Sequence, residues 1–268
     1  MAGTYRYRIE PRDVDASLRV RLCAMGDLVL RAAGDDADTL GFGVRDLNTD
    51  GASWVLSRMA VEMRRLPSRH EELDVYTWVS DYGRLVTTRN MTVSAAGSDG
   101  GAGSGNAGDG SDDAGDGGGQ LGAAVTQWAM IDLATRRPLD LSALSDKGTS
   151  LVDRRPPIDR PHKVGPFGRN ADGEFDFKVQ PHRVVYSDID FNGHVNSMKY
   201  LEWMVDTLPP EAIAEMDGFR FDVNYIHEAR LGDRLEICCG RDDTGAHLFD
   251  IVNAGGLSIC KATIARMD

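Results

Sequence analysis

Three polar side chains at alternate positions, Asp190, Asn192 and His194, form the part of this sequence best suited to chemistry. They lie in the stretch 188-DIDFNGHVN-196, and an apolar, aromatic-rich segment follows directly. Burying a carboxylate, an amide and an imidazole is costly unless each is partnered. A cluster of this kind therefore either forms a turn or takes part in a reaction.

Turn formation explains part of the pattern, because Asp, Asn and Gly favour turns and Asn196 or Ser197 could cap the helix predicted over residues 195–207. It does not account for His194. The alternating spacing would instead place the three functional groups on one side of an extended approach to the start of that helix. Backbone N–H groups at a helix start favour developing negative charge, so this position suits the stabilisation of an oxyanion.

Other types of catalytic site fit less well. The sequence has no GxSxG elbow, no phosphate-binding loop, no GxGxxG after a strand and no HExxH motif. As metal ligands, Asp190, Asn192 and His194 would offer two oxygens and one imidazole, which is a weak set. We therefore expect neither a metal nor a cofactor.

Composition narrows the class of protein. The chain has 268 residues, 41% of them hydrophobic, which is enough for one large or two ordinary domains with a packed core. A net charge of −12 argues against a nucleic-acid partner. The sequence starts without the apolar run of a signal peptide and nowhere reaches the ~18 apolar residues of a membrane span, so we expect a cytoplasmic protein. Four cysteines without CxxC spacing favour buried, reduced thiols.

The same order of elements is predicted twice along the chain. In the first half a strand (4–10) and a helix (17–34) precede strands near 53–66, 72–80, 84–94 and 123–133. In the second half a strand (177–186) and a helix (195–207) precede strands near 219–228, 233–239, 246–252 and 257–265. One helix lying across a run of antiparallel strands is an α+β layout.

Local similarity supports a duplication. Residues 61–75 align with 223–237 without a gap, which places Glu228 opposite Leu66. In this register the first half lacks counterparts of Asp190, Asn192, His194 and Glu228, so we expect only the second half to carry the catalytic set.

Two segments are predicted to lack regular structure. Residues 95–119 consist only of Gly, Ala, Ser, Asp and Asn, and indicate a flexible loop within an enlarged hairpin. A segment rich in Pro, Gly and charge divides the chain into a first domain over 1–140, a linker over 141–175 and a second domain over 176–268.

The string DxNGHVNSMKYLEW, residues 190–203, resembles the second-repeat motif of acyl-ACP thioesterases. These are tandem-hotdog enzymes that end fatty-acid synthesis by hydrolysing the acyl thioester of acyl-carrier protein. Residues 54–93 and 127–141 are similar to the N-terminal repeat of that family. The shorter core DxxGHVN is also shared with single-hotdog acyl-CoA thioesterases.

The resemblance implies a covalent pseudo-dimer of two hotdog domains, each a long helix wrapped by an antiparallel sheet, with the acyl chain between helix and sheet. It makes Asp190, Asn192, His194 and Glu228 the catalytic positions. Glu228 would be the general base for water, with Asp190 orienting the cluster, while Asn192 and His194 polarise the thioester carbonyl. The family often has a cysteine after the acid, whereas Ala229 stands here, which favours direct attack by water.

Three other functions stay open at this point. An acyl-CoA thioesterase shares the chemistry, a hotdog hydratase uses Asp and His with a different motif, and a non-catalytic acyl-binding protein could lose the polar set. The resemblance also implies acyl-carrier protein as a partner, with a homodimer of the tandem chain as a further expectation. Because that carrier is acidic like this chain, docking would need a basic patch. The candidates are Arg64, Arg65, Arg69, Arg136, Arg137, Arg154, Arg155, Arg160 and Lys163.

Overall fold

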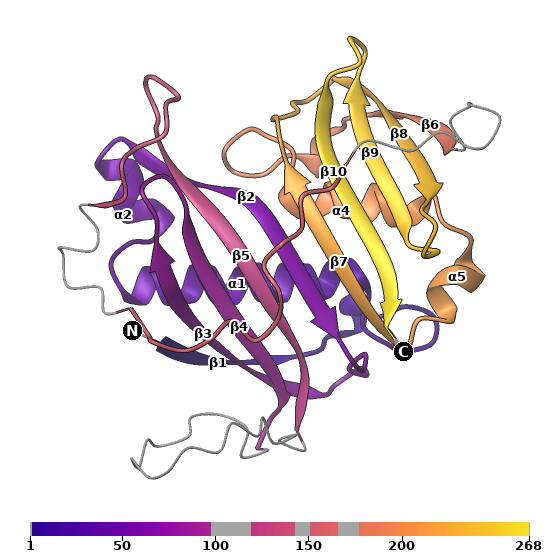
Figure 1. The fold of residues 1–268 in the computed structure, drawn as a ribbon, viewed down its shortest axis with the longest axis horizontal. Helices are drawn as coiled ribbons and strands as arrows, with labels where there is room; N and C mark the ends of the chain where they lie inside the picture. The colour runs from indigo at the N-terminus through magenta and orange to yellow at the C-terminus, as the bar shows by residue number, and fades with distance from the viewer. Residues whose placement is uncertain (1, 98–118, 143–150, 166–176, 268) are drawn as a thin grey trace.

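A computed structural model of the chain describes residues 2–97, 119–142, 151–165 and 177–267. Its strands form one antiparallel sheet in the order β1-β3-β4-β5-β2-β7-β10-β9-β8-β6 (Figure 1). The first half contributes β1 (Ala2–Arg8), α1 (Leu22–Thr39), α2 (Val44–Thr49), β2 (Ala52–Met63), β3 (Glu72–Tyr82), β4 (Thr87–Ala95) and β5 (Gln120–Asp132). The second half contributes β6 (Phe177–Arg183), α4 (Ser197–Asp206), α5 (Pro210–Ala214), β7 (Gly218–Tyr225), β8 (Arg234–Arg241), β9 (His247–Asn253) and β10 (Ser258–Met267).

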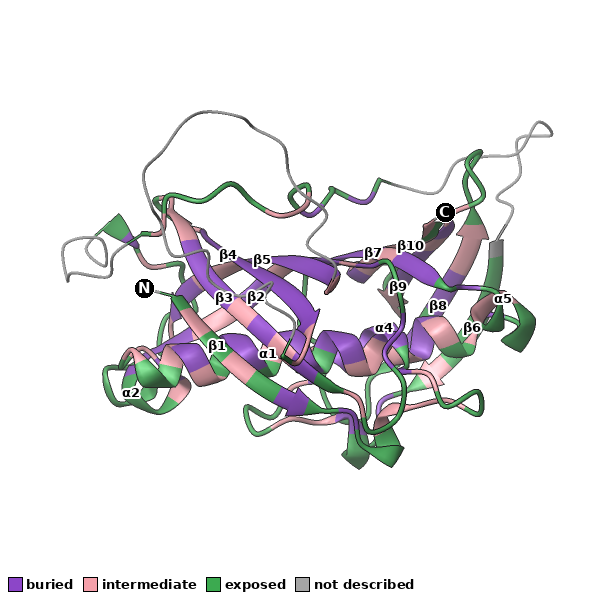
Figure 2. Ribbon diagram, turned by 90° about the horizontal axis from the view of Figure 1, so that it is seen from below, coloured by how far each residue is buried: buried purple, intermediate pink, exposed green. Residues whose placement is uncertain are grey.

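The two halves meet in the middle of the sheet, where β2 pairs with β7 from Arg58 opposite Asn224 to Met63 opposite Phe219. All ten predicted strands are present, and the α+β layout is confirmed. Both long helices lie on the same side of the sheet (Figure 2). Their apolar stripes face it, because residues such as Met25 and Val29 of α1 and Leu201 of α4 recur at helical spacing and are fully buried.

The start of α1 differs from its prediction. The helix begins at Leu22, and the residues before it form a turn in which Val14 bridges Val20 and Leu18 has φ of 61°. The spacing between Leu18 and Leu22 resembles a helix periodicity, but the Leu18 side chain is 48% exposed. Local hydrogen bonds to the Asp15 carboxylate hold this turn instead of the first helical turn.

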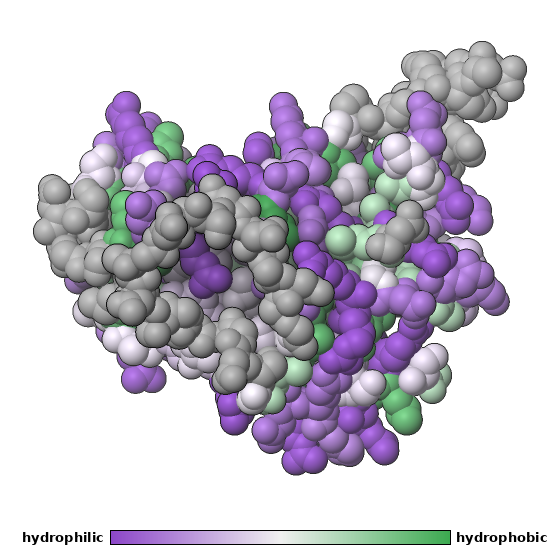
Figure 3. Space-filling model, turned by 60° about the horizontal axis from the view of Figure 1, so that its bottom comes forward, coloured by the Kyte–Doolittle hydropathy of each residue, from purple (hydrophilic) through white to green (hydrophobic). Residues whose placement is uncertain are grey.

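The predicted hairpin is also present, because β4 pairs with β5 from Thr87 opposite Trp128 to Ser94 opposite Gln120. Most of the glycine-rich loop that joins them lies outside the described residues. On the face of the molecule in Figure 3, the described residues are mostly hydrophilic, and hydrophobic side chains show as small separate groups.

The described part of the linker crosses the face of the sheet opposite the helices (Figures 1 and 2). It is fastened at two places. Near β3, the Val152 amide donates to the Val79 carbonyl, and the Arg154 guanidinium stacks on Trp78, 4.9 Å from the ring centre. Near β7, the His162 amide donates to the Asp222 carboxylate over 2.7 Å.

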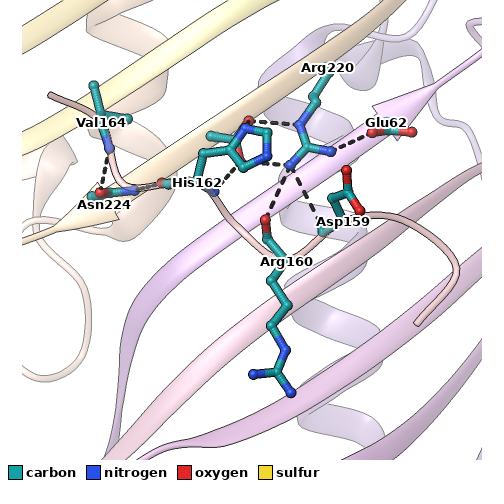
Figure 4. A network of polar contacts seen from close by, with 8 residues as sticks. Glu62, Asp159, Arg160, His162, Val164, Arg220 and Asn224 are labelled. Atoms are coloured by element: carbon teal, nitrogen blue, oxygen red, sulfur yellow. Dashed lines mark hydrogen bonds and ion pairs between the residues drawn. The ribbon is translucent and has the colours of Figure 1, made fainter. Parts of the chain in front are cut away.

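Arg220 organises this second fastening (Figure 4). It donates to Glu62 of β2 over 2.5 Å, to Asp222 over 2.8 Å, and to the linker carbonyls of Asp159 and Arg160. The Asp222 side chain is only 3% exposed, and its charge is balanced by Arg220. The linker, β2 and β7 are therefore held together at the boundary between the two halves.

Candidate active site

The loop before α4 is a tight turn and not the extended approach predicted from sequence. Asp190 Oδ1 accepts hydrogen bonds from the amides of Asn192 (2.8 Å) and His194 (3.3 Å). The Asp190 amide in turn donates to the His194 carbonyl over 2.8 Å, and Gly193 has φ of 77°, which favours glycine. The short polar side chain of Asp190 therefore shapes the backbone, and the alternation of residue types reflects a turn.

The start of α4 combines a cap with an open donor. Asn196 caps the helix, as predicted, because its Oδ1 accepts from the Met198 amide over 2.8 Å. The Lys199 amide donates to the Asn196 carbonyl. Among the described residues, the Ser197 amide has no hydrogen-bond acceptor, and Ser197 borders the main cavity. One backbone donor at the helix start is thus available to a ligand.

Glu228 reaches the loop from outside the sheet. The sequence predicted a strand to residue 228, but β7 ends at Tyr225, and the amides of Ile226 and His227 both donate to the carbonyl of Ile259 as the chain leaves the sheet. The Val195 amide then donates to the Ala229 carbonyl over 2.9 Å, which ties this segment to the loop. As a result, Glu228 Oε2 lies 3.1 Å from His194 Nε2.

Two arginines that sequence reasoning did not place in the site complete it. Arg136, in the turn after β5, forms an ion pair with Glu228 Oε1. Arg230 Nη2 lies 3.3 Å from His194 Nε2. Because that nitrogen cannot both accept from Arg230 and donate to Glu228, the tautomer of His194 decides which contact is a hydrogen bond. Arg136 lies 92 residues before Glu228, so no local sequence pattern connects the two.

Tyr200 supports the same segment from α4. Its hydroxyl accepts a hydrogen bond from the Ala229 amide over 3.1 Å. Burial raises the pKa of Tyr200 above its usual value, so the hydroxyl stays protonated at neutral pH. The residue next to Glu228 is therefore fixed on both sides, by Tyr200 and by Val195.

The site opens into a cavity of about 850 Å³ that both halves line. Asp190, Asn192, His194 and Glu228 all border it, so the structure brings the four predicted residues together. The opposite wall comes from the first half and includes Leu30, Ala33 and Ala37 of α1 and Trp54 and Leu56 of β2. A cavity that combines such apolar side chains with the polar cluster before α4 is suited to an acyl chain whose reactive carbon lies at that cluster.

One expectation about the first half is wrong. The turn before α1 superposes in its hydrogen bonds on the turn before α4, and Asp15 occupies the place of Asp190. The first half therefore keeps a counterpart of Asp190 while Ser17, Arg19 and Leu66 replace Asn192, His194 and Glu228.

The remaining predictions concern groups outside the cluster. In the residues that the structure describes, no group of three His, Cys, Asp or Glu side chains could hold a metal ion, and all four cysteines are free. No helix in the described ranges is long and apolar enough to cross a membrane. Several candidate docking arginines already have partners. Arg65 pairs with Glu71, Arg136 with Glu228, and Arg160 lies 3.7 Å from Asp81.

Two helices wrapped by one antiparallel sheet, with a carboxylate and an imidazole beside a cavity that both halves line, define a tandem-hotdog protein. Comparison with known proteins identifies the family. The model of the acyl-ACP thioesterase N-terminal domain matches residues 3–101, and that of the C-terminal domain matches residues 173–265. A crystallised acyl-ACP thioesterase from Bacteroides thetaiotaomicron is 31% identical, with 99% of this chain and 98% of that chain covered and a TM-score of 0.77. The chain belongs to the acyl-ACP thioesterase family.

More distant relatives are similar over most of the chain. The 12:0-ACP thioesterase from Umbellularia californica has the same fold, at 18% identity and a TM-score of 0.76, with 99% of this chain and 97% of that chain covered. A chloroplastic acyl-[acyl-carrier-protein] hydrolase from Cuphea viscosissima is 26% identical over 70% of this chain and 41% of its own length. A chloroplastic oleoyl-acyl carrier protein thioesterase from Coriandrum sativum is 22% identical over 91% of this chain. The chain spans 64% of the length of that relative, so it corresponds to part of the plant proteins.

Proposed function

We propose that this chain hydrolyses the thioester of fatty acyl-acyl-carrier protein and releases the free fatty acid. The observation that carries the proposal is the pair of Glu228 and His194, 3.1 Å apart beside a cavity that both halves line, in a member of this family. A carboxylate and an imidazole in contact can take a proton from water and return one to the leaving group.

The proposed reaction balances with the groups present. Glu228 takes a proton from the attacking water, and the water oxygen bonds to the thioester carbonyl carbon. The Asn192 side-chain amide, His194 and the open Ser197 N–H polarise the carbonyl and hold the oxyanion that forms. The carbonyl then re-forms as the C–S bond breaks, and the protonated Glu228 returns its proton to the sulfur, so the carrier leaves as a thiol.

The remaining residues position these groups. Asp190 holds the turn that presents Asn192 and His194, and Arg136 orients the Glu228 carboxylate. Ala229 stands beside Glu228, so the thiol that this position carries in other members cannot act as a nucleophile here.

A panel of acyl-carrier-protein and acyl-CoA thioesters of matched chain length tests the proposal. We expect kcat/KM to be higher for the carrier-protein substrates. Faster turnover of the CoA series would assign the chain to acyl-CoA instead, and the absence of hydrolysis with intact acyl binding would make it an acyl-binding protein. Hydration of an enoyl thioester without hydrolysis would favour the hydratase. The homodimer and the cytoplasmic location stay predictions.

A further inference from the structure

A buried cation, Arg89 of β4, lies in the wall that the first half contributes to the acyl cavity. Its side chain is 10% exposed and borders the cavity. Arg89 Nη1 donates to Asp36 Oδ2 of α1 over 2.5 Å and to the Thr77 hydroxyl of β3 over 3.1 Å. None of these groups takes part in the proposed hydrolysis.

The residues that line the cavity extend across the sheet from the catalytic cluster. They include Tyr225 at the end of β7, Leu56 on β2, Trp128 on β5 and Arg89 on β4, and also Val79 and Tyr82 on β3. The strands β7, β2, β5 and β4 are consecutive neighbours in the sheet. Three inter-strand spacings of about 4.8 Å give a path of about 14 Å. The distal carbon of an extended acyl chain of that length would therefore meet Arg89.

Arg89 has hydrogen-bond donors to spare. Within the described part of the chain, its Nη1 makes both of its hydrogen bonds, and Nε and Nη2 have no acceptor. Neither nitrogen is among the side-chain atoms that are sealed off without a partner, so both retain access to the cavity that Arg89 borders. Guanidinium N–H groups of this kind are strong donors whose desolvation without an acceptor is costly.

The carboxylate beside Arg89, that of Asp36, already has a hydrogen-bond donor at each oxygen. Asp36 is 3% exposed, its Oδ2 accepts from Arg89, and its Oδ1 accepts from the Tyr5 hydroxyl over 3.1 Å. Asp36 also balances the charge of Arg89. The Nε and Nη2 groups of Arg89 therefore offer hydrogen-bond donors whose positive charge is already balanced by Asp36. This favours a neutral acceptor over a second carboxylate.

We propose that Arg89 makes the β4 side of the cavity a binding site for an acyl chain whose distal carbon carries a neutral oxygen, a hydroxyl or a carbonyl. This inference rests on the proposed function, because it takes the cavity to hold the acyl chain. A methyl end that reaches Arg89 would displace water from Nε and Nη2 and leave them without acceptors. A hydroxyl oxygen at the same place would replace the water.

Binding of non-hydrolysable acyl-pantetheine amides tests the inference separately from catalysis. Two series of graded chain length would be titrated into the wild-type protein by calorimetry, one ending in a methyl group and one in a hydroxyl. We expect a single chain length at which the hydroxyl end binds roughly tenfold or more tightly than the methyl end, which is the scale of a hydrogen bond to a charged group. A carboxylate end should bind more weakly than the hydroxyl.

The double variant Asp36→Asn/Arg89→Met removes the charge pair without leaving a lone buried charge. We expect it to lose the preference for the hydroxyl end and to bind methyl-ended chains at least as well as the wild type. The matched control is Arg6→Met/Asp74→Asn, which makes the same two changes at an exposed pair between β1 and β3, where Arg6 Nε lies 2.8 Å from Asp74. The control should keep the preference.

A wild-type protein that prefers methyl ends at every chain length would overturn the inference, as would an unchanged preference in the folded double variant. If the double variant does not fold, the same titrations of the wild type and of Arg89→Lys are compared. Because lysine has a different reach from arginine, Arg89→Lys should change the chain length at which the hydroxyl end is preferred. Discrimination in binding without hydrolysis of any acyl-carrier protein would overturn the proposed function and leave this inference standing. Hydrolysis of acyl-carrier-protein substrates without any preference for the hydroxyl end would support the proposed function and overturn this inference.

Discussion

The turns before the two long helices, residues 13–20 and 188–195, have the same backbone and different side chains. In the first turn Asp15 Oδ1 accepts from the amides of Ser17 (2.8 Å) and Arg19 (3.2 Å). In the second, Asp190 Oδ1 accepts from the corresponding amides over 2.8 and 3.3 Å. A carboxylate that is needed equally in a turn without a catalytic set is a structural requirement of the turn. In the proposed reaction Asp190 would therefore act through the groups it presents.

The groups presented by the two turns have diverged. Arg19, in the place of His194, crosses to the second half, where its Nη1 lies 2.9 Å from Asp217 Oδ1 and its Nη2 donates to the Ala214 carbonyl over 2.7 Å. His194 instead faces a cavity and contacts Glu228. The first turn thus makes a contact between the halves, while side chains of the second border the cavity.

The supporting residues have changed in step. The amides of Val20 and Val195 donate to the carbonyls of Pro67 and Ala229, respectively, so these two positions correspond. Proline has no N–H, and Met25 of α1 stands where α4 has Tyr200, whose hydroxyl accepts the Ala229 N–H. A hydroxyl is present only in the half that has a donor to satisfy. The two halves thus share the backbone of this turn and differ in the side chains around it.

The largest expected effect is at Glu228, whose counterpart in the first half is the apolar residue Leu66. Glu228→Gln and Glu228→Ala should each lower kcat/KM for an acyl-ACP by ~10²-fold or more, because the general base is lost. Glu236→Gln, an exposed carboxylate on β8 away from the cavity, is the control and should be active. Steady-state kinetics would measure the effect, and activity of Glu228→Gln within threefold of the wild type would exclude it as the base.

The second prediction compares the two turns directly. Asp190→Ala and Asp15→Ala each remove two hydrogen bonds from backbone amides to a carboxylate, so we expect each to lower the free energy of unfolding by about 1–3 kcal/mol. Only Asp190→Ala should also lower kcat/KM, by ~10²-fold, because it displaces His194 and Asn192. Urea denaturation and kinetics on the same samples would measure both. Equal losses of activity would mean that the first turn takes part in catalysis.

A smaller effect is expected at Arg136, the residue of the first half that contacts the catalytic carboxylate. Arg136→Gln should lower kcat/KM for a small uncharged thioester about tenfold, since Glu228 loses one of its two partners. Arg137→Gln is the matched control. The Arg137 side chain is exposed and adjacent in sequence to Arg136, so its loss should affect only the docking of a carrier protein and leave turnover of the small thioester unchanged. A threefold or smaller change of kcat/KM in Arg136→Gln would show that the ion pair between Arg136 and Glu228 does not support catalysis.

The last prediction concerns stability and tests the exchange of Tyr200 for Met25. Tyr200→Phe leaves the buried Ala229 N–H without an acceptor and should lower the free energy of unfolding by about 1–3 kcal/mol. Met25→Leu, a change of similar volume in α1, should cost less than about 1.5 kcal/mol. Chemical denaturation measures both. If Tyr200→Phe is as stable as the wild type, its hydrogen bond does not explain why the two helices differ.

Much of the fold could be predicted because strands carry their own signals. Alternating β-branched and aromatic residues between turn signals located every strand, and the duplication register placed Glu228 opposite Leu66 correctly. The start of α1 was misplaced, because Leu18 has helical spacing while the Asp15 carboxylate holds a turn. In the site, motif residues were found by their type and spacing. Arg136 and Arg230 were not, since their roles depend on contacts between segments that the sequence does not show to be close.

The pairing of β2 with β7 has a consequence for how the protein is made. The sheet of the first half is complete only once β5 has been made, and about 86 residues separate the end of β5 at Asp132 from the start of β7 at Gly218. At ~5–20 residues per second, the first half waits roughly 4–17 s on the ribosome with β2 as an open edge strand. Charged side chains discourage an open edge from pairing with other chains, and β2 carries Arg58 and Glu62 there. Once β7 has been made and pairs with β2, Glu62 accepts a hydrogen bond from Arg220. The same charged side chain that discourages wrong pairing of the nascent chain therefore joins the two halves in the folded protein.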